Sequence, residues 1–118
     1  MSMSMDEKQS LRKMSKQLIK LVRQAEMSEK AIEQYLVKQV RKAGGICLKY
    51  SNPGETGYPD RICLLPEGKV IFVELKSTGE KPRKIQQVRM NELKGIGFEV
   101  HICDSREFVD TILEEVMR

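Results

Sequence analysis

Apolar and polar residues change their spacing along the chain, and each change predicts a new element. Over residues 8–26, apolar residues recur at three- and four-residue steps opposite a basic stripe, which predicts an amphipathic helix. A second helical pattern follows Ser28, a residue type that caps helices, and ends at the stop signal Gly44-Gly45. Residues 46–50 predict a short strand, and the turn formers of residues 51–59 predict a loop.

The rest of the chain predicts a strand hairpin, followed by two helices with a strand between them. Residues 60–65 and 70–76 are the predicted hairpin strands, and residues 98–103 are the later strand. One helix is predicted over residues 83–95, and another begins at a cap formed by Asp104 or Ser105. Their predicted inward side chains are Ile85, Val88, Met90 and Leu93 in the first helix, and Phe108, Ile112, Leu113 and Val116 in the second.

This order, α-α-β-β-β-α-β-α, predicts an α/β fold in which helices flank a mixed sheet. The passage from strand 70–76 through a helix to strand 98–103 would be a right-handed crossover, which makes these two strands parallel. We expect residues 1–7 to be a frayed leader, and residues 1–27 to be an N-terminal arm that includes the first helix. Residues 28–118 then form the globular domain.

Composition supports a single small globular domain. The chain has 118 residues, of which 40% are hydrophobic and 32% charged, so a proper core is possible. The polar N-terminus and the lack of any apolar run of about 18 residues argue against secretion and against membrane spanning. We therefore expect a cytoplasmic protein with no membrane partner.

Charge is unevenly distributed, and the first part of the chain is strongly basic. From Lys8 to Lys49 there are 11 basic and 3 acidic residues, a balance of +8, whereas residues 50–118 have 10 against 12, or −2. A basic segment attracts polyanions, but charge alone does not distinguish nucleic acid from acidic protein or lipid. For the helix over residues 8–26, a solvated face, a phosphate-facing helix and a dimer-forming arm all stay open.

The three cysteines stand far apart in the sequence, each beside apolar residues. Cys47, Cys63 and Cys103 are odd in number and include no Cys-x-x-Cys pair. This pattern argues against a disulfide framework and against a structural zinc site. We predict three reduced, buried thiols without disulfide partners.

The chemically informative residues are expected to meet at one end of the predicted hairpin. Asp60 opens its first strand, and Glu74 and Lys76 lie two residues apart on the second, so both point to the same face. A symmetric two-residue turn would pair Asp60 with Leu75 and place Asp60 on the opposite face. We therefore predict a three-residue turn or a bulge, which shifts the register by one residue.

Two carboxylates and a lysine at a strand end can hydrolyse phosphodiesters. Asp60 and Glu74 offer oxygen ligands for Mg²⁺ or Mn²⁺, which polarises a phosphoryl oxygen and lowers the pKa of a bound water. Lys76 can orient that water or stabilise the charge on the attacked phosphate. Taken singly, these motifs also fit an ordinary turn aspartate and a surface ion pair.

Basic and aromatic residues nearby are candidates for nucleic-acid contacts. Lys81, Arg83 and Lys84 flank the start of a predicted helix, where backbone N–H groups and cations together suit a phosphate. Lys49 is expected near the same sheet edge. Tyr58 could stack on a base or fill the loop, and the sequence does not separate these two roles.

Four segments occur in order over residues 28–110: AIEQYLVKQVRKAGG, GYPDRICLLPEGKVIFVELKS, GEKPRKIQ and LKGIGFEVHICDS. Together they resemble the PD-(D/E)XK nucleases and, more closely, the virus-type replication-repair nuclease (VRR-NUC) family. The resemblance implies a PD-(D/E)XK core, in which a mixed sheet is flanked by helices, and a metal-dependent nuclease activity.

The resemblance also implies roles for five residues. Asp60 and Glu74 match the two main metal ligands, and Lys76 matches the catalytic lysine. Glu33 matches an acidic residue that joins the metal site directly or through water. Gln86 matches a glutamine that helps to hold the site or the attacked phosphate. Its neighbour Gln87 fits the family spacing less well.

The substrate and the assembly are likewise implied by the resemblance. We expect a stand-alone, phage-type nuclease that cuts DNA, similar to the Holliday-junction resolvases that act in DNA repair as homodimers on branched DNA. A monomeric nicking or flap-type endonuclease is one alternative. A DNA-binding accessory protein without turnover is another, although the complete set of five site residues argues against it.

Overall fold

The computed structural model describes residues 4–25 and 28–118, with the backbone alone over residues 17–25. These residues contain the eight predicted elements in the predicted order, together with one 3-10 turn, η1 (Pro66–Gly68). The helices are α1 (Met5–Ala25), α2 (Glu29–Lys42), α3 (Lys84–Gly95) and α4 (Arg106–Val116), and the strands are β1 (Ile46–Lys49), β2 (Arg61–Leu65), β3 (Lys69–Leu75) and β4 (Glu99–Cys103). The α/β fold class predicted from the sequence is confirmed.

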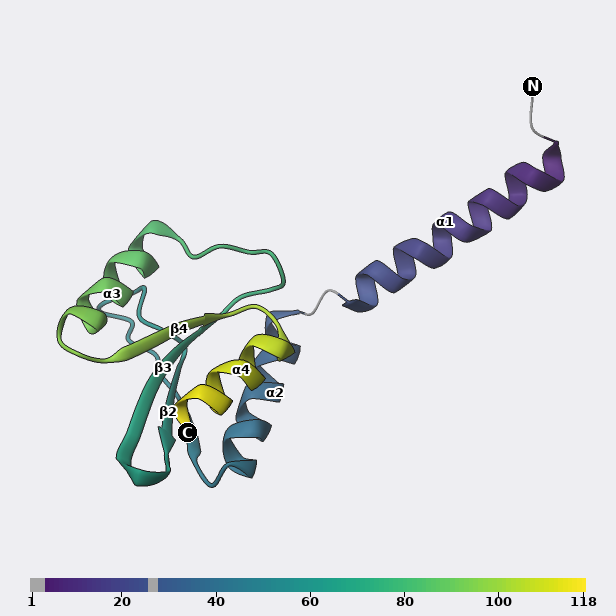
Figure 1. Ribbon diagram of the computed structural model, residues 1–118. Coiled ribbons are helices and arrows are strands. Elements are labelled where there is room, and N and C mark those ends of the chain that lie inside the picture. The colour runs from purple at the N-terminus through teal and green to yellow at the C-terminus, as the bar shows by residue number, and fades with distance from the viewer. Residues whose placement is uncertain (1–3, 26–27) are drawn as a thin grey trace.

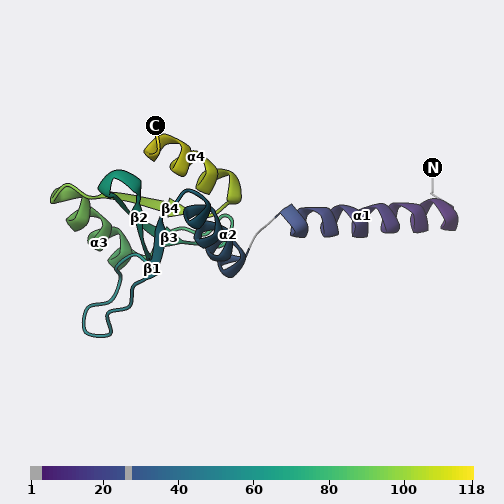
Figure 2. The same cartoon turned by 90° about the horizontal axis from the view of Figure 1, so that it is seen from below.

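The four strands form one mixed sheet in the order β1-β2-β3-β4. The first three strands pair antiparallel, whereas β4 pairs parallel to β3, as the crossover through α3 predicts. Helices α2 and α4 pack together on one side of the sheet, and α3 lies on the other side (Figures 1 and 2). The ends of β2 and β3 are therefore reached by helices from both faces.

The hydrophobic core lies between the sheet and the α2–α4 pair. Ile71, Val73 and Leu75 alternate along β3 and are at most 1% exposed. They face Ile32, Leu36 and Val40 of α2 and Val109, Ile112 and Leu113 of α4. The prediction that Phe108 points inward is wrong, because Val109 continues the three- and four-residue spacing of the inward positions and Phe108 is 40% exposed.

Helix α3 turns a polar as well as an apolar side chain toward the sheet. The prediction that Ile85 and Val88 point inward is wrong, because these side chains are 37% and 46% exposed. Gln86 and Met90, one turn apart, are buried instead. Gln86 finds a hydrogen-bond partner on β3, and a satisfied polar side chain of this kind leaves no signal in an apolar pattern.

The turn between β2 and β3 sets the register of the hairpin. It spans the three residues of η1, and two of them are left-handed, with φ of 66° and 74°. Arg61 pairs with Val73, so the next pair outward sets Asp60 opposite Glu74. The predicted irregularity is confirmed, and it takes the form of a three-residue turn.

Helix α1 begins earlier than predicted, because Ser4 caps it. The Ser4 Oγ accepts a hydrogen bond from the Glu7 N–H at 3.1 Å, and Asp6 and Glu7 add favourable charge to the first turn. Residues 5–7 are therefore helical rather than frayed, whereas residues 1–3 lie outside the described residues, as do residues 26–27, the last two of the predicted arm 1–27. In both views α1 projects away from the sheet (Figures 1 and 2). None of the helices in the described ranges has the length and apolar character needed to cross a bilayer.

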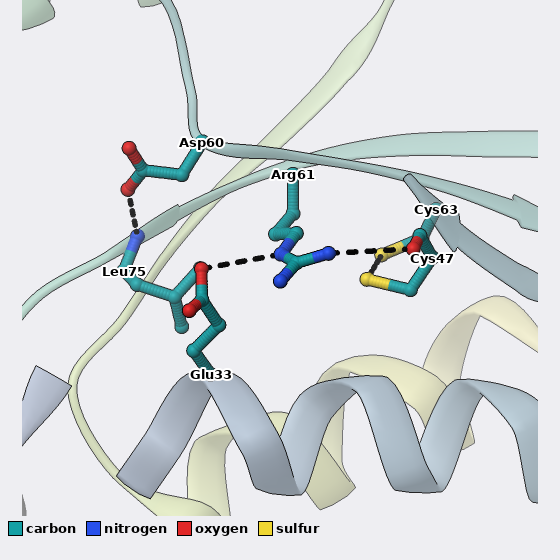
Figure 3. Close-up of polar contacts among 6 residues, drawn as sticks. All are labelled: Glu33, Cys47, Asp60, Arg61, Cys63 and Leu75. Carbon is teal, nitrogen blue, oxygen red and sulfur yellow. Dashed lines mark hydrogen bonds and ion pairs between the residues drawn. The ribbon is translucent and has the colours of Figure 1, made fainter. Parts of the chain in front are cut away.

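Two of the three cysteines meet across neighbouring strands. Cys63 and Cys103 are buried and Cys47 is half-buried, and all three are free thiols. Cys47 stands directly opposite Cys63 in the β1–β2 pairing, with the sulfur atoms 3.8 Å apart (Figure 3). Burial raises the pKa of Cys103 to about 12, and the hydrogen bond that the Cys63 thiol donates to Cys47, with burial, raises the pKa of Cys63. These two groups therefore stay protonated at neutral pH.

We predict that Gly45→Ala destabilises the fold. A Cβ at Gly45 would lie 2.5 Å from the carbonyl oxygen of Leu64 and 3.0 Å from Cδ2 of Leu65. Because the nearer neighbour is the backbone of β2, we expect the free energy of unfolding in urea to fall by about 1–3 kcal/mol. Gly95→Ala is the matched control, since its Cβ would meet no described atom within 4 Å beyond the adjacent residues and its own helix backbone, and alanine favours a helix. Equal losses in the two variants would contradict this account.

Candidate active site

Asp60 lies where the end of β2 adjoins the end of β3. Its carbonyl oxygen accepts a hydrogen bond from the Tyr50 N–H at 2.8 Å, which extends the β1–β2 pairing by one residue. Its side-chain Oδ2 accepts a hydrogen bond from the Leu75 N–H at 3.2 Å (Figure 3). The carboxylate is therefore fixed against β3, beside Glu74, and is more than a turn residue.

Glu74 and Lys76 lie on the α3 side of the sheet with Gln86, and all three are buried, at 2%, 8% and 6% exposure. The Gln86 Nε2 donates a hydrogen bond to Glu74 Oε1 at 3.1 Å. The Lys76 Nζ lies 3.9 Å from the same oxygen. The structure thus brings together four of the five residues predicted for the active site, including Asp60.

The orientation of the Gln86 amide is fixed by a second hydrogen bond. Its Oε1 accepts from the Arg83 N–H at 2.7 Å, at the start of α3, so its NH₂ group points to Glu74. The neighbouring Gln87 is exposed and donates to the Pro82 carbonyl instead. Gln86, rather than Gln87, is therefore the glutamine that reaches the carboxylates.

The Glu74 carboxyl group sits in an unfavourable environment for a negative charge. Burial, and then the charge of Asp60, raise its pKa to about 8, although Lys76 acts in the opposite direction. Its Oε2 is buried and has no hydrogen-bond partner among the residues that the structure describes. A buried oxygen without a donor is costly, and a bound cation is a partner that would satisfy it.

Asp60 and Glu74 suit a divalent metal ion, for which they would supply only some of the ligands. Their oxygen atoms are the hard ligands that Mg²⁺ and Mn²⁺ prefer. Within residues 4–25 and 28–118, no three His, Cys, Asp or Glu side chains gather into a complete ligand set. Mg²⁺ commonly keeps several waters and binds one or two carboxylates together with substrate phosphates. The residues present suit that mode, and the metal itself stays a prediction.

Glu33 is the predicted site residue that the structure does not bring to the other carboxylates. Its Oε2 lies 3.2 Å from the Nε of Arg61, on the α2 side of the sheet (Figure 3). The two side chains are only 23% and 15% exposed, so this ion pair is partly shielded from water. The predicted role of Glu33 at a metal, directly or through water, stays a prediction.

Glu29, in the first turn of α2, is a candidate site residue that the sequence reasoning missed. Its pKa is raised by partial burial and then by the charge of Asp60, while Lys76 acts in the opposite direction. Glu29 in turn raises the pKa of Glu74. Because Glu29 and Glu33 are four residues apart, they share a helix face. That spacing is the sequence signal from which Glu29 could have been named, beside Glu33, as a candidate for the acidic residue of α2 at the metal site.

The basic residues predicted to contact nucleic acid are exposed around this site. Lys81, Arg83 and Lys84 lie at the N-terminal end of α3, with their side chains in solvent. Arg83 lines a hollow together with Asp60. Lys49 is exposed at the end of β1. These positions allow phosphate contacts, and the predicted nucleic-acid contacts stay a prediction.

Tyr58 is packed into the loop before Asp60. The guanidinium of Arg89 lies 4.9 Å from the centre of its ring, and its hydroxyl group donates to Glu92 at 3.3 Å. Of the two roles open from the sequence, the loop-filling one is therefore visible in the structure. A base contact by Tyr58 stays a prediction.

No protein-family model matches the chain, but it is similar to a protein named as a nuclease and to a solved structure. The protein named "Putative nuclease p44", from Acyrthosiphon pisum secondary endosymbiont phage 1, is 47% identical over 79 residues, which is 67% of this chain and 85% of p44. A solved structure described as "VRR_NUC domain" is 28% identical with a TM-score of 0.71, and the match covers 75% of this chain and 97% of that one.

The sheet order and the flanking helices are those of a nuclease with a PD-(D/E)XK core. Within this class, the chain belongs to the VRR-NUC family. The family resemblance seen in the motifs is thereby confirmed, and so is the fold that it implied.

We predict that the titration of Glu74 weakens the metal-free fold as the pH rises. Its pKa of about 8 lies above the ordinary value of 4.5, so folding favours the protonated form. The stabilising contribution is complete below pH 4.5 and is lost as the pH rises to about 8. Between pH ~5 and ~8.5, wild type should lose on the order of 4 kcal/mol of unfolding free energy relative to Glu74→Gln. Parallel urea-stability profiles for the two proteins would refute this prediction.

Proposed function

We propose that this protein is a metal-dependent, structure-selective DNA endonuclease that hydrolyses phosphodiester bonds with Mg²⁺ or Mn²⁺. The observation that supports it most directly is the buried Glu74, whose Oε2 has no hydrogen-bond partner in the part of the chain that the structure describes, while a second carboxylate, Asp60, is held beside it. Membership of the VRR-NUC family and the similarity to p44 add support for nuclease chemistry.

The residues of the site divide the work of phosphodiester hydrolysis. Asp60 and Glu74 would hold the metal ion, which when bound polarises a phosphoryl oxygen and acidifies a water molecule. Lys76, 3.9 Å from Glu74, would orient the attacking water or stabilise the charge that develops on the phosphate. Gln86 and the Leu75 N–H keep the two carboxylates in place.

The DNA backbone would be held by cations on both sides of the site. Lys81, Arg83 and Lys84 stand at the start of α3, where the helix dipole also favours an anion. Lys49 would add a contact from β1. A second hollow of about 470 Å³ runs along α2 and is lined by Lys38, Arg41 and Lys42, together with Arg61 and the acidic Glu33. Contacts of this kind position DNA without reading its sequence, which suits recognition of DNA shape.

We further propose a homodimer acting on branched DNA in the manner of a Holliday-junction resolvase, in the cytoplasm of the host cell. Two active sites related by a two-fold axis could cut opposed strands of a junction. Helix α1 projects from the sheet with Leu11 and Met14 exposed at 47% and 63%, and an apolar stripe of this kind suits pairing with a second copy. A monomeric nicking or flap-type enzyme, or a binding-only accessory protein, would need no such pairing.

The first test is cleavage of a labelled four-way junction in Mg²⁺ or Mn²⁺, beside linear duplex and single-stranded DNA. We expect paired, symmetric cuts by wild type, and a rate at least about 100-fold lower for Lys76→Ala, because an electrostatic group at the reacting phosphate is lost. Lys94→Ala, which removes an exposed lysine at the far end of α3, is the control and should cut normally. Binding without cutting by wild type in both metals would refute the nuclease proposal. Unpaired nicks by a monomer would refute the resolvase part alone.

A second test separates the two acidic residues of α2. If Glu29 is the carboxylate that joins the site, Glu29→Gln should weaken Mn²⁺ binding by about tenfold in calorimetry and slow cleavage, because second-shell metal contacts commonly contribute 10- to 100-fold. Glu33→Gln should then act mainly on stability, through the loss of its pair with Arg61. The opposite pattern would return the metal role to Glu33, as the family resemblance implies.

A further inference from the structure

A hollow of about 300 Å³ opens directly beside Asp60, between the loop of residues 51–59 and the start of α3. Its wall includes Tyr50, Asn52, Tyr58 and Arg83. It also includes Asp60 and Gln86, so the hollow shares a wall with the carboxylate site. A group bound in the hollow would therefore lie next to the phosphate that the site attacks.

Two tyrosine rings stand in this wall, and one of them is accessible. Tyr50 and Tyr58 meet edge to face, with ring centres 6.0 Å apart and planes at 89°. Tyr58 is already covered by Arg89, whereas Tyr50 is 37% exposed. The Tyr50 hydroxyl accepts a hydrogen bond from the Asn52 Nδ2 at 3.1 Å, which steadies the ring. Tyr50 is therefore the ring that the hollow offers to a ligand.

The loop that carries these groups is held in place by its own hydrogen bonds and by α3. Asn52 Oδ1 accepts from the N–H groups of Gly54 and Glu55, both at 3.1 Å. The Arg89 Nε donates to the Thr56 carbonyl at 3.1 Å. A Cβ at Gly57, where φ is +95°, would lie 2.8 Å from a side-chain carbon of Ile85, so the loop packs closely on α3. The hollow is therefore preorganised, although its loop has no regular secondary structure.

The chemistry of the wall fits a planar, aromatic, hydrogen-bonding ligand attached to a phosphate. An aromatic ring stacks on any nucleobase, an amide can bond to its edge, and Arg83 can pair with the adjoining phosphate. A volume of about 300 Å³ is at the small end of ligand pockets, which suits one base rather than a base pair.

We propose that this hollow receives a single unpaired nucleobase, stacked on Tyr50, while the adjoining phosphate lies at the carboxylate site. The proposal rests on the proposed nuclease function and specifies its substrate. A base inside a duplex must first leave its stack, whereas a base at a branch point, gap or frayed end is already free to enter. The hollow would thus select DNA structure without selecting sequence, because every base has a face on which to stack.

The test is a binding cycle that pairs an abasic site in the DNA with a change at Tyr50. Binding is measured by fluorescence anisotropy in a Lys76→Ala background, so that the branched DNA stays intact. The abasic site is moved one position at a time through the nucleotides at the branch. We expect one position at which it weakens binding by about 5- to 150-fold. Tyr50→Leu should weaken binding of intact DNA by a similar factor and abolish the effect of the abasic site.

Two control variants separate stacking from other effects of the substitution. Tyr50→Phe keeps the ring and loses only the bond from Asn52, so it should retain most of the abasic effect. Tyr35→Leu removes a ring from α2 that bonds to Asp110 of α4, outside the hollow, and should leave the abasic effect unchanged. The proposal would be overturned if the losses of binding free energy caused by the abasic site and by Tyr50→Leu were additive. It would also be overturned if an abasic site weakened binding at no position.

A second measurement does not depend on how Tyr50→Leu folds. DNA that carries 5-iododeoxyuridine at the sensitive position is irradiated with the Lys76→Ala protein, and the crosslinked peptide is identified by mass spectrometry. A crosslink to Tyr50 is expected, and crosslinks only elsewhere would overturn the base pocket. Neither readout requires cleavage. Wild type that never cuts therefore refutes the nuclease function alone, cutting without Tyr50 coupling refutes the pocket alone, and no DNA binding refutes both.

Discussion

The hairpin register between β2 and β3 is the constraint on which the site depends. Because side chains alternate across a strand, a shift of one residue would move Asp60 to the α2 side of the sheet. Glu74 would then face solvent and α3 without Asp60 beside it. The three residues of η1 prevent that shift by placing Arg61 opposite Val73. The hydrogen bond from the Leu75 N–H to Asp60 then completes the arrangement. A turn at one end of the hairpin thus determines the chemistry at the other end.

The same arrangement keeps a carboxyl group where the fold alone would not favour one. Glu74 is 2% exposed, lies against a second carboxylate and has one oxygen without a partner among the described residues. Lys76 and Gln86 compensate only through its other oxygen. Proteins tolerate such local cost where activity requires it and offset it with a well-packed scaffold. Here the scaffold is the opposite, apolar face of β3, which packs against α2 and α4. The side chains on either side of Glu74 along the strand belong to that face.

The elements and the meeting of Asp60 with Glu74 could be predicted from the sequence, because helix periodicity, strand alternation and hairpin closure are local properties. The sequence did not predict those features that depend on how whole helices dock on the sheet. Glu29 and Glu33 share a face of α2, and only the packing of that helix determines which turn lies near the strand ends. The exposure of Phe108 likewise depends on the rotation of α4 about its axis, which a short apolar pattern leaves uncertain by one position.

Gln86 links the start of α3 to the Glu74 carboxyl group through a single amide. Its oxygen accepts from the Arg83 N–H, and its nitrogen donates to Glu74, so the position demands an acceptor and a donor at the end of one long side chain. Glutamate would set an acceptor against Glu74, lysine would leave the Arg83 N–H without an acceptor, and asparagine is shorter by one methylene. Few other residues could therefore replace glutamine at this position without a loss of folding stability. For that reason glutamine would persist there even in a descendant that had lost the reaction.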